Sequence, residues 1–214
     1  MKSVGLGWAS LAIALSSIEA SSAKWKKVHE EDGVKVYERN IGDLIAFRGE
    51  GKIKAPLGKL LYVIEDSAHW KEWIENFDSG RVLERKSPFH KVFYQSFDSP
   101  FPVKDRDIVY EAKTIREAGS SKVIIAMRSV VHPKAPKTVG VRVDLKYTRY
   151  EITPLPDGYL QVVLETSSDP GGSLPGFLVN WAQRDYPLKL FKGLRRQVKK
   201  KHAKFAPLPP KTTN

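Results

Sequence analysis

The chain has 214 residues, a formal net charge of +12 and no cysteine. This length suffices for one domain with a substantial core, and the lack of cysteine excludes a disulfide framework, a thiolate metal site and a cysteine nucleophile. The positive charge favours an anionic partner, either a nucleic acid or an anionic membrane surface, although a basic surface that only confers solubility is an equal alternative.

The first 23 residues have the pattern of a secretory signal peptide. Lys2 gives a positively charged n-region, residues 4–18 are uncharged and mostly apolar, and Ser21-Ser22-Ala23 offers small residues at the cleavage site. The apolar run is shorter than the ~20 residues of a spanning helix, which disfavours a retained membrane anchor. We expect an exported protein, periplasmic or secreted and peripheral to a membrane, for which nucleic acid is a poor partner.

The mature chain begins with alternating apolar residues that predict a β-hairpin. Asp32-Gly33 is a turn signal, and a second turn is expected at residues 40–43. The next strand has an apolar face interrupted by Gly49 and Gly51. Glycines inside a strand are typical of a sharp bend or a bulge, which a strongly curved sheet requires.

Pro56 opens a helical pattern in which Leu57 to Ile64 carry apolar residues at the spacing of one helix face. The same spacing recurs from Trp70 to Phe77, so the sequence predicts two short helices with a break near residues 66–68. An aromatic stripe of this kind is more typical of a core than of a ligand site.

Consecutive strands joined by short turns are predicted between residues 81 and 166, which favours an antiparallel meander. The expected strands are Val82–Arg85, Lys91–Phe97, Asp107–Glu117, Lys122–Val131, Gly140–Thr153 and Tyr159–Thr166. One connection is unusual: Ser99 to Lys104 contains two prolines and an apolar tip, which predicts an ordered loop rather than a tight hairpin. Lys104 to Asp107, at the end of this loop, are expected to form an ion-pair cluster, with Arg106 as the exception that meets a ligand group.

A joint rich in glycine and proline, Asp169 to Gly176, precedes a long amphipathic helix that is expected to end near Lys201. Apolar residues follow one face and cations the other, and no acidic residue follows Asp185. This charge pattern suits both the helix dipole and an anionic membrane surface. Pro187 is expected to kink the helix or to remove a hydrogen bond. Residues 207–214 are expected to form a loose tail.

Together these elements predict an α+β helix-grip fold for residues 24–206, in which a curved antiparallel sheet of seven to nine strands wraps around the C-terminal helix. The covered concave face predicts a hollow for an apolar ligand. Strand alternation, in which an error of one residue reverses the face, puts five side chains near that ligand. They are Phe97, Met127, Val143, Val162 and Leu164.

The sequence resembles the steroidogenic acute regulatory protein-related lipid transfer (START) family over almost all of the mature chain. The resemblance is carried by Asp32 to Tyr37, Trp70 and Trp73, Pro102 to Asp107, His132-Pro133, and Asp169 to Pro175 followed by Leu178-Val179-Asn180. It implies an exported, bacterial-type member that holds one lipid in a tunnel between the sheet and the last helix and carries it between membranes. We expect a monomer without cofactor or metal.

The resemblance also implies roles for individual residues. In the family, the loop before the Arg-Asp pair and the last helix form a gate. The expected gate or membrane contacts are Phe101, Pro102, Lys189, Lys192 and Arg196. The expected ligand contacts of the helix are Phe177, Leu178 and Trp181. Arg106 matches one arginine that meets a polar lipid group, but the second, six residues later, is Ala112, which puts sterol-type polar recognition in doubt.

Three other functions compete with a lipid carrier. An enzyme of the wider helix-grip superfamily, a cyclase or hydrolase of an apolar substrate, would need an acid and a base that converge in the pocket. The five histidines are scattered without metal-binding spacing, and no Gly-x-Ser-x-Gly elbow or phosphate loop occurs. A protein-interaction module would have its cavity filled by side chains, and nucleic-acid binding ranks last because of the predicted export.

Overall fold

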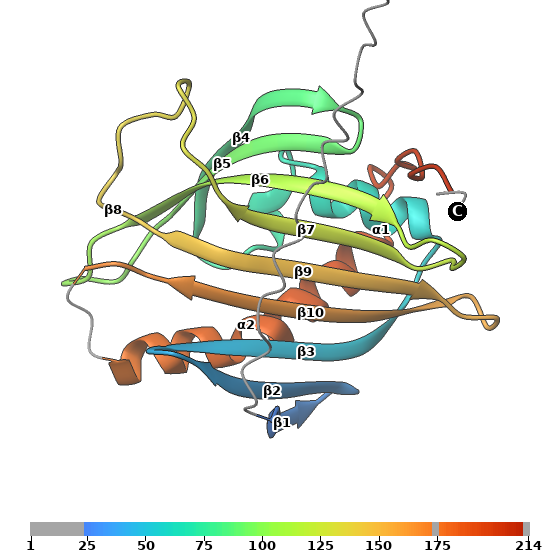
Figure 1. The fold of residues 1–214 in the computed structure, drawn as a ribbon, viewed down its shortest axis with the longest axis horizontal. Helices are drawn as coiled ribbons and strands as arrows, with labels where there is room; N and C mark the ends of the chain where they lie inside the picture. Colours follow the sequence, from blue (N-terminus) through green and yellow to red (C-terminus); the bar gives the residue numbers. More distant parts are fainter. Residues whose placement is uncertain (1–23, 173–175, 212–214) are drawn as a thin grey trace, which may run out of the picture.

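The computed structural model describes residues 24–172 and 176–211, with the side chains of 173–183 outside the description. Its centre is a ten-stranded sheet in the order β1-β2-β3-β10-β9-β7-β6-β5-β4, with β8 beside β6 (Figure 1). The strands are β1 (Lys26–Glu31), β2 (Val34–Ile41), β3 (Leu44–Lys54), β4 (Phe77–Ser87), β5 (His90–Phe97), β6 (Arg106–Arg116), β7 (Val123–Ser129), β8 (Val141–Arg142), β9 (Asp144–Pro154) and β10 (Tyr159–Asp169). The sheet exceeds the expected seven to nine strands because β1 pairs along β2 and the short β8 pairs with β6 in parallel.

The described helices are α1 (Leu57–Glu65), the 3₁₀ helix η1 (Trp70–Glu72) and α2 (Gly176–Gln197). The prediction of a second helix from Trp70 to Phe77 is therefore wrong, because the structure has only one 3₁₀ turn, Trp70–Glu72, in this segment. Asn76 adopts a left-handed backbone conformation with φ of 53°, and Phe77 already begins β4. The Trp70 indole donates a hydrogen bond to the Ile64 carbonyl over 3.0 Å, so burial of the aromatic stripe, rather than a helix, explains its spacing.

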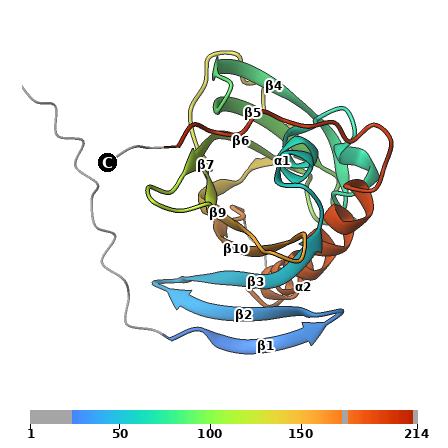
Figure 2. The ribbon, with the colours of Figure 1, turned by 90° about the vertical axis from the view of Figure 1, so that its right-hand side faces the viewer.

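The sheet curls into an incomplete barrel, and Figure 2 shows α1 and α2 in the gap between β3 and the β4–β5 edge. This is the predicted helix-grip arrangement of a curved antiparallel sheet around a C-terminal helix. The main core lies between the inner face of the sheet and the two helices, where Ile53, Phe93, Phe191 and Leu194 are at most 2% exposed. None of the described helices has the length and apolar character needed to span a membrane.

The two glycines of β3 admit α2 against the sheet. The register of β3 with β10 is continuous from Lys54↔Tyr159 to Phe47↔Thr166, so β3 has no bulge at either glycine, and of the expected bend or bulge only the bend remains. A Cβ atom on Gly49 would lie 2.7 Å from the Cβ of Pro187, and one on Gly51 would lie 3.0 Å from the Phe191 ring. Side chains at these positions would push the helix away, and glycine permits the close approach.

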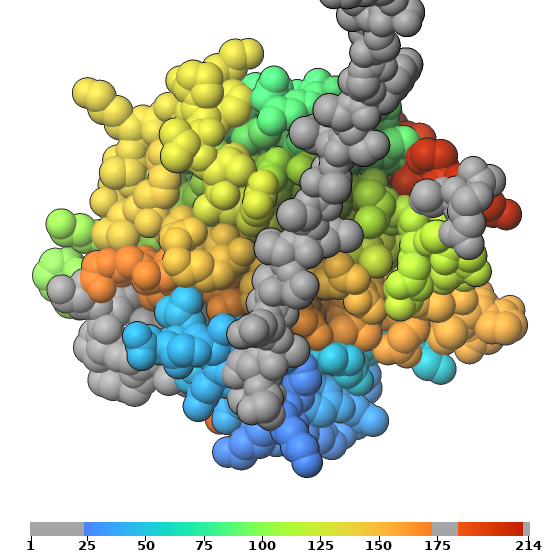
Figure 3. All heavy atoms as spheres, in the orientation of Figure 1, coloured from blue at the N-terminus to red at the C-terminus, as the bar shows by residue number. Residues whose placement is uncertain are grey.

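The loop that connects β7 and β8, residues 130–140, covers a second apolar cluster on the outer face of the sheet. Val130 and Ala135 of the loop pack against the cluster, which consists of Leu83, Val92, Tyr94 and Val109. Figure 3 shows this loop in yellow at the upper left, beside the green atoms of β4 and β5. At the C-terminus, residues 198–211 return to α1, where the Ala206 amide donates to the Gly58 carbonyl over 3.0 Å and Pro209 is buried.

Candidate ligand cavity

A cavity of about 380 Å³ lies between the inner face of the sheet and α2. It occupies the end of the barrel where β5 leads into the loop 98–105, β6 begins, and β10 meets the joint that precedes α2. The described residues that line it are Ile64, Trp70, Trp73, Ile74, Gln95, Phe97, Arg106, Ile108, Tyr110, Met127, Val143, Leu145, Thr148, Tyr150, Thr166, Ser168, Pro170, Tyr186 and Leu190. The volume is at the lower end of the ~300–1,000 Å³ typical of small-molecule sites.

Four residues expected to contact the ligand lie on this wall: Phe97, Arg106, Met127 and Val143. Val162 and Leu164 face the same side of the sheet but are 0% exposed in the packed core and are not part of the described wall. Val162 and Leu164 pair with Gly51 and Gly49 of β3, and at these glycines α2 packs directly against the inner face of the sheet. Alternation identifies the inner face of a strand, whereas the position of the helix decides which part of that face is hollow.

The helix residues Phe177, Leu178 and Trp181 have side chains outside the described residues. The described part of α2 contributes Tyr186 and Leu190 to the wall, one helical turn apart. Pro187, between them, is buried against Gly49.

The wall combines aromatic and aliphatic groups with a set of neutral polar side chains. This polar set is Gln95, Tyr110, Thr148, Tyr150, Thr166, Ser168 and Tyr186. None of the seven was predicted from the sequence, although alternation on β5 gave one signal, because Gln95 shares the inner face with Phe97. Arg106 is the single charged residue of the described wall. This part of the wall has neither a carboxylate nor an imidazole, the pair with which a hydrolase or cyclase would work.

Burial keeps the hydroxyls of Tyr110 and Tyr150 protonated, because it raises the pKa of both. It raises the pKa of Tyr110 above its ordinary value, and Tyr186 and Glu65 nearby raise it further. Burial likewise raises the pKa of Tyr150, with further contributions from Tyr186 and Tyr110. The hydroxyls of Thr148 and Thr166 lie 2.8 Å apart and hydrogen-bond each other. The polar groups around the cavity are thus hydrogen-bonding groups without charge, apart from Arg106.

The Arg-Asp pair at the start of β6 divides between the two faces of the sheet. Arg106 lines the cavity and donates a hydrogen bond to the Lys104 carbonyl. Asp107 is fully buried and accepts two hydrogen bonds from Arg142, over 2.8 and 2.9 Å. The expected ion-pair cluster within residues 104–107 is therefore wrong, because Asp107 pairs with a residue from the other side of the loop 130–140.

Two backbone amides of the loop 98–105 donate hydrogen bonds within the loop, and its tip is exposed. The Ser99 amide donates to the Asp105 carboxylate over 2.9 Å, and the Val103 amide donates to the Pro100 carbonyl over 2.9 Å. Phe101, the expected gate residue, is 97% exposed, and Pro102 beside it is also exposed. An aromatic side chain in full contact with water at the edge of a cavity is available to a membrane.

The three expected cations of α2 are exposed, but two of them have partners. Lys189 forms an ion pair with Glu75 over 2.7 Å, and Arg196 donates to the Glu72 carbonyl over 2.6 Å. Lys192 has no ion-pair partner among the described residues. The basic face of the helix is thus partly engaged within the molecule.

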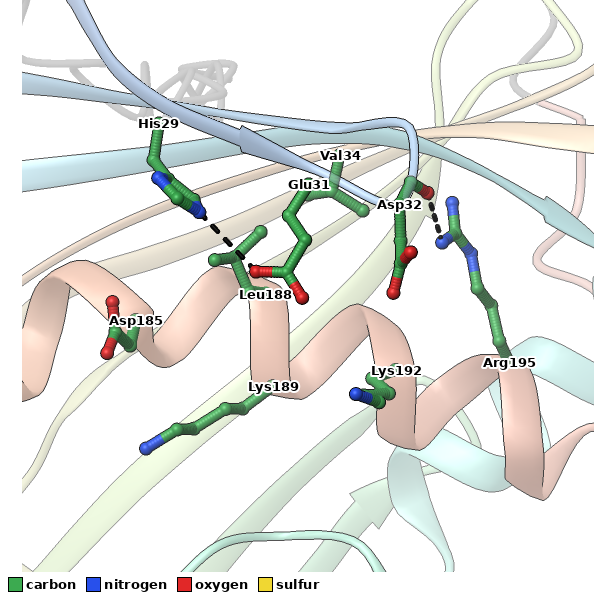
Figure 4. Close-up of a pocket in the computed structure, with 9 residues that line it drawn as sticks. All are labelled: His29, Glu31, Asp32, Val34, Asp185, Leu188, Lys189, Lys192 and Arg195. Carbon is green, nitrogen blue, oxygen red and sulfur yellow. Dashed lines mark hydrogen bonds and ion pairs between the residues drawn. The ribbon is translucent and has the colours of Figure 1, made fainter.

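A second cleft, of about 520 Å³, lies between α2 and the β1–β2 hairpin (Figure 4). Figure 4 shows acidic side chains of the hairpin, Glu31 and Asp32, opposite the helix residues Lys189 and Lys192. Arg195 closes one end of this cleft by donating to the Asp32 carbonyl over 2.7 Å. Its walls carry charges of both signs and, among the described residues, only two apolar side chains, Val34 and Leu188, so it suits an apolar ligand less well than the first cavity.

Among the described residues, one cluster of potential metal ligands forms where the distant His202 meets Asp66 and His69. His69 Nδ1 donates a 2.7 Å hydrogen bond to the Asp66 carboxylate, and the His69 ring stacks on His202 with a centroid distance of 3.6 Å and an interplanar angle of 3°. The in-plane lone pairs of parallel rings do not converge, so one ion would bind both only after one ring turned.

Comparison with known proteins gives a consistent result. A family profile described as START domain matches residues 9–204. The chain is 29% identical to the uncharacterized protein PA1579 of Pseudomonas aeruginosa, over 85% of this chain and 90% of that protein. It is 27% identical to the phosphatidylcholine transfer protein of Bos taurus, over 77% of this chain and 79% of that protein. The crystal structure of a STAR-related lipid transfer protein from Xanthomonas axonopodis superposes with a TM-score of 0.69 at 25% identity, over 82% of this chain and 99% of that one.

Proposed function

The chain belongs to the START domain family, and from this we propose that it binds one lipid or similarly apolar molecule in the cavity beside α2 and transfers it between membranes. The observation that carries the proposal is the mainly apolar cavity of about 380 Å³ lined by Trp70, Phe97, Met127 and their neighbours. The lipid-transfer relative from Bos taurus supports it, because its similarity extends over most of both chains.

Transfer of this kind needs no catalytic group. An acyl chain gains about 0.8 kcal/mol per buried CH₂ group in a membrane or in a protein pocket, so the two environments nearly balance. The barrier is passage through water, and a protein that docks on the membrane and opens beside it shortens that passage. The cavity end with the exposed Phe101 is the end that we propose to dock. Lys104 and Lys192 are exposed and suit an anionic surface.

We further propose that the protein works outside the cytoplasm, as a periplasmic or secreted carrier. The signal-peptide pattern of residues 1–23 supports this location. Cell fractionation combined with N-terminal sequencing of the mature protein tests it, with a start near residue 24 as the expected result. A chain recovered from the cytoplasm with residues 1–23 still attached would overturn this part of the proposal.

Filling the cavity is expected to abolish lipid binding. We predict that Met127→Trp, on the cavity wall, removes the lipid that mass spectrometry detects after native purification and extraction. It should also weaken binding of a fluorescent lipid more than about tenfold, because the added ring takes the space of the ligand.

Ala126→Trp is the matched control, because Ala126 is the neighbouring residue, exposed on the opposite face of β7. This variant should retain its lipid and its affinity. Equal lipid content in the two variants and the parent, with folding verified by the thermal unfolding temperature, would show that the cavity does not hold the ligand.

The loop tip is expected to drive membrane docking. Phe101→Asp should reduce co-sedimentation with vesicles of anionic phospholipid at least about tenfold, since burial of a Phe side chain contributes ~1.5–3 kcal/mol. Ile115→Asp serves as the control, because Ile115 is 55% exposed but lies near the far end of β6. Comparable losses in both variants, or in neither, would contradict docking through the loop.

A further inference from the structure

The C-terminal segment, residues 198–211, exposes two large apolar side chains at the surface. Phe205 is 66% exposed and Leu208 is 45% exposed. The chain that carries them is packed against α1, because the Ala206 amide donates to the Gly58 carbonyl over 3.0 Å (Figure 2, segment in red). Two exposed apolar side chains are ordinary by themselves, and it is the charge around them that indicates a partner.

The surface around Phe205 and Leu208 is basic. The C-terminal segment contributes five exposed lysines and no carboxylate, and the end of β3 and the first turn of α1 add two more lysines. These residues are Lys199, Lys200, Lys201, Lys204, Lys211, Lys54 and Lys59. Among the described residues none of the seven has a partner in an ion pair, and Lys200 alone interacts with a carboxylate, that of Glu72. We call Phe205, Leu208 and the seven lysines the C-terminal surface.

The C-terminal surface continues into a basic cleft of about 1060 Å³ on the outer face of β3 and β10. Lys54 and Lys199 belong to both. The described residues that line the cleft include six cations and one carboxylate, and this carboxylate, Glu50, pairs with Arg48 over 2.6 Å. The positive charge therefore extends well beyond the C-terminal segment, and it attracts anionic surfaces.

The C-terminal surface lies at the end of the barrel opposite the exposed Phe101. β10 begins at Tyr159, which pairs with Lys54, and ends at Asp169, beside the cavity. Its 11 residues span roughly 35 Å at ~3.3 Å each. Figure 1 shows the C-terminal segment in red on the right and the turn between β5 and β6 in light green on the left. One molecule thus has an exposed aromatic residue at each end.

The chemistry of the C-terminal surface matches an anionic bilayer. A bilayer offers hydrocarbon to Phe205 and Leu208 and phosphate groups to the lysines around them. A second copy of the chain would bring the same positive charges together, and like charges repel each other. A nucleic acid would satisfy the lysines but would offer no hydrocarbon to Leu208, and the proposed export separates the protein from nucleic acids.

We propose that the C-terminal surface binds one anionic membrane while Phe101 docks on another, so that a single molecule bridges two bilayers. The inference rests on the proposed function and deepens it, because a carrier that contacts donor and acceptor together shortens the passage of the lipid through water. The C-terminal surface is the weaker contact of the two. Phe205 is partly covered by α1, whereas Phe101 is almost fully exposed and has more apolar area to insert.

A vesicle-capture assay measures bridging directly. Vesicles of phosphatidylcholine and phosphatidylglycerol in equal parts are immobilised, incubated with the full mature protein, washed, and exposed to dye-labelled vesicles of the same composition. Phe205→Asp should reduce the captured dye at least about tenfold and change protein binding to the immobilised vesicles less than about twofold. Lys201→Glu combined with Lys204→Glu should have the same effect through charge alone. Phe101→Asp should reduce both capture and binding.

Two variants serve as controls for the assay. Phe205→Leu keeps an apolar anchor and should capture dye within about twofold of the parent. Val131→Asp introduces a carboxylate at a fully exposed valine of the loop 130–140 and should leave capture unchanged. The thermal unfolding temperature verifies that each variant is folded.

Equal capture by the parent, Phe205→Asp and the double lysine variant would overturn bridging and leave the carrier function standing. A parent dimer in solution that Phe205→Asp dissociates, detected by light scattering, would also overturn it, because two molecules would then link the vesicles. Tighter binding of a double-stranded oligonucleotide than of vesicles, lost in the double lysine variant, would assign the surface to nucleic acid instead. If the protein bound no vesicles and no lipid co-purified with it, the proposed function itself would fail.

Discussion

Arg142→Met is expected to lower the free energy of unfolding by about 3–5 kcal/mol, because it leaves a buried carboxylate without its counter-ion. Asp107 is 0% exposed, and Arg142 binds it through Nε and a terminal nitrogen, over 2.8 and 2.9 Å. The same guanidinium donates to the Pro136 carbonyl over 2.9 Å, so it also ties the loop 130–140 to β6. Urea unfolding at neutral pH measures the loss.

Two further variants make this prediction specific. Arg149→Met removes a partly exposed arginine that pairs with Glu151, and should cost less than about 1 kcal/mol. The double variant Asp107→Leu with Arg142→Met should recover most of the stability, because it removes both members of the buried pair. If Arg142→Met behaved like Arg149→Met, the pair would contribute little to the fold.

Gly49→Val is expected to lower the free energy of unfolding by about 2–3 kcal/mol through overpacking. Its first side-chain carbon would lie 2.7 Å from Pro187 and 3.2 Å from Phe191, and a proline ring in a helix has little freedom to yield. The helix would have to shift away from β3, which also changes the shape of the cavity that it closes. We therefore expect weaker binding of a fluorescent lipid in the same variant.

Lys52→Val is the control for this substitution, because Lys52 is exposed on the outer face of the same strand. Valine is well suited to a strand, so the control should retain its stability within about 0.5 kcal/mol. Equal stability of Gly49→Val and Lys52→Val in urea unfolding would mean that α2 does not need the two glycines.

Local periodicity predicted the inner face of the sheet well. Phe97, Met127 and Val143 were assigned to that face from alternation, and all three line the cavity. Period-two alternation follows directly from strand geometry, so it requires no knowledge of the strand's neighbours. Periodicity gave a wrong prediction from Trp70 to Phe77, where apolar residues at helical spacing belong to a short 3₁₀ turn and its surroundings. Burial of these side chains, and not a helix, accounts for their spacing.

The polar features of the molecule depended on contacts between distant segments. Asp107 was assigned to a cluster within its own loop, but its partner Arg142 lies 35 residues further along the chain. His69 and His202 were considered separately and are stacked in the fold. Ion pairs and ring stacking require only that the two groups are close in space. The spacing of residues along the chain does not predict which distant segments come into contact.

The order of strands and helices, the inward faces, and the need for a terminal helix over an apolar sheet all follow from the sequence, because hydrophobic side chains repeat with the period of the element that buries them. The extent of the hollow was decided by tertiary structure alone. Gly49 and Gly51 bring α2 down on β3 and fill one half of the barrel, while the other half, with Gln95 and Tyr110 on its wall, stays open. Where a helix settles depends on the packing of every side chain beneath it, and no single segment encodes that sum.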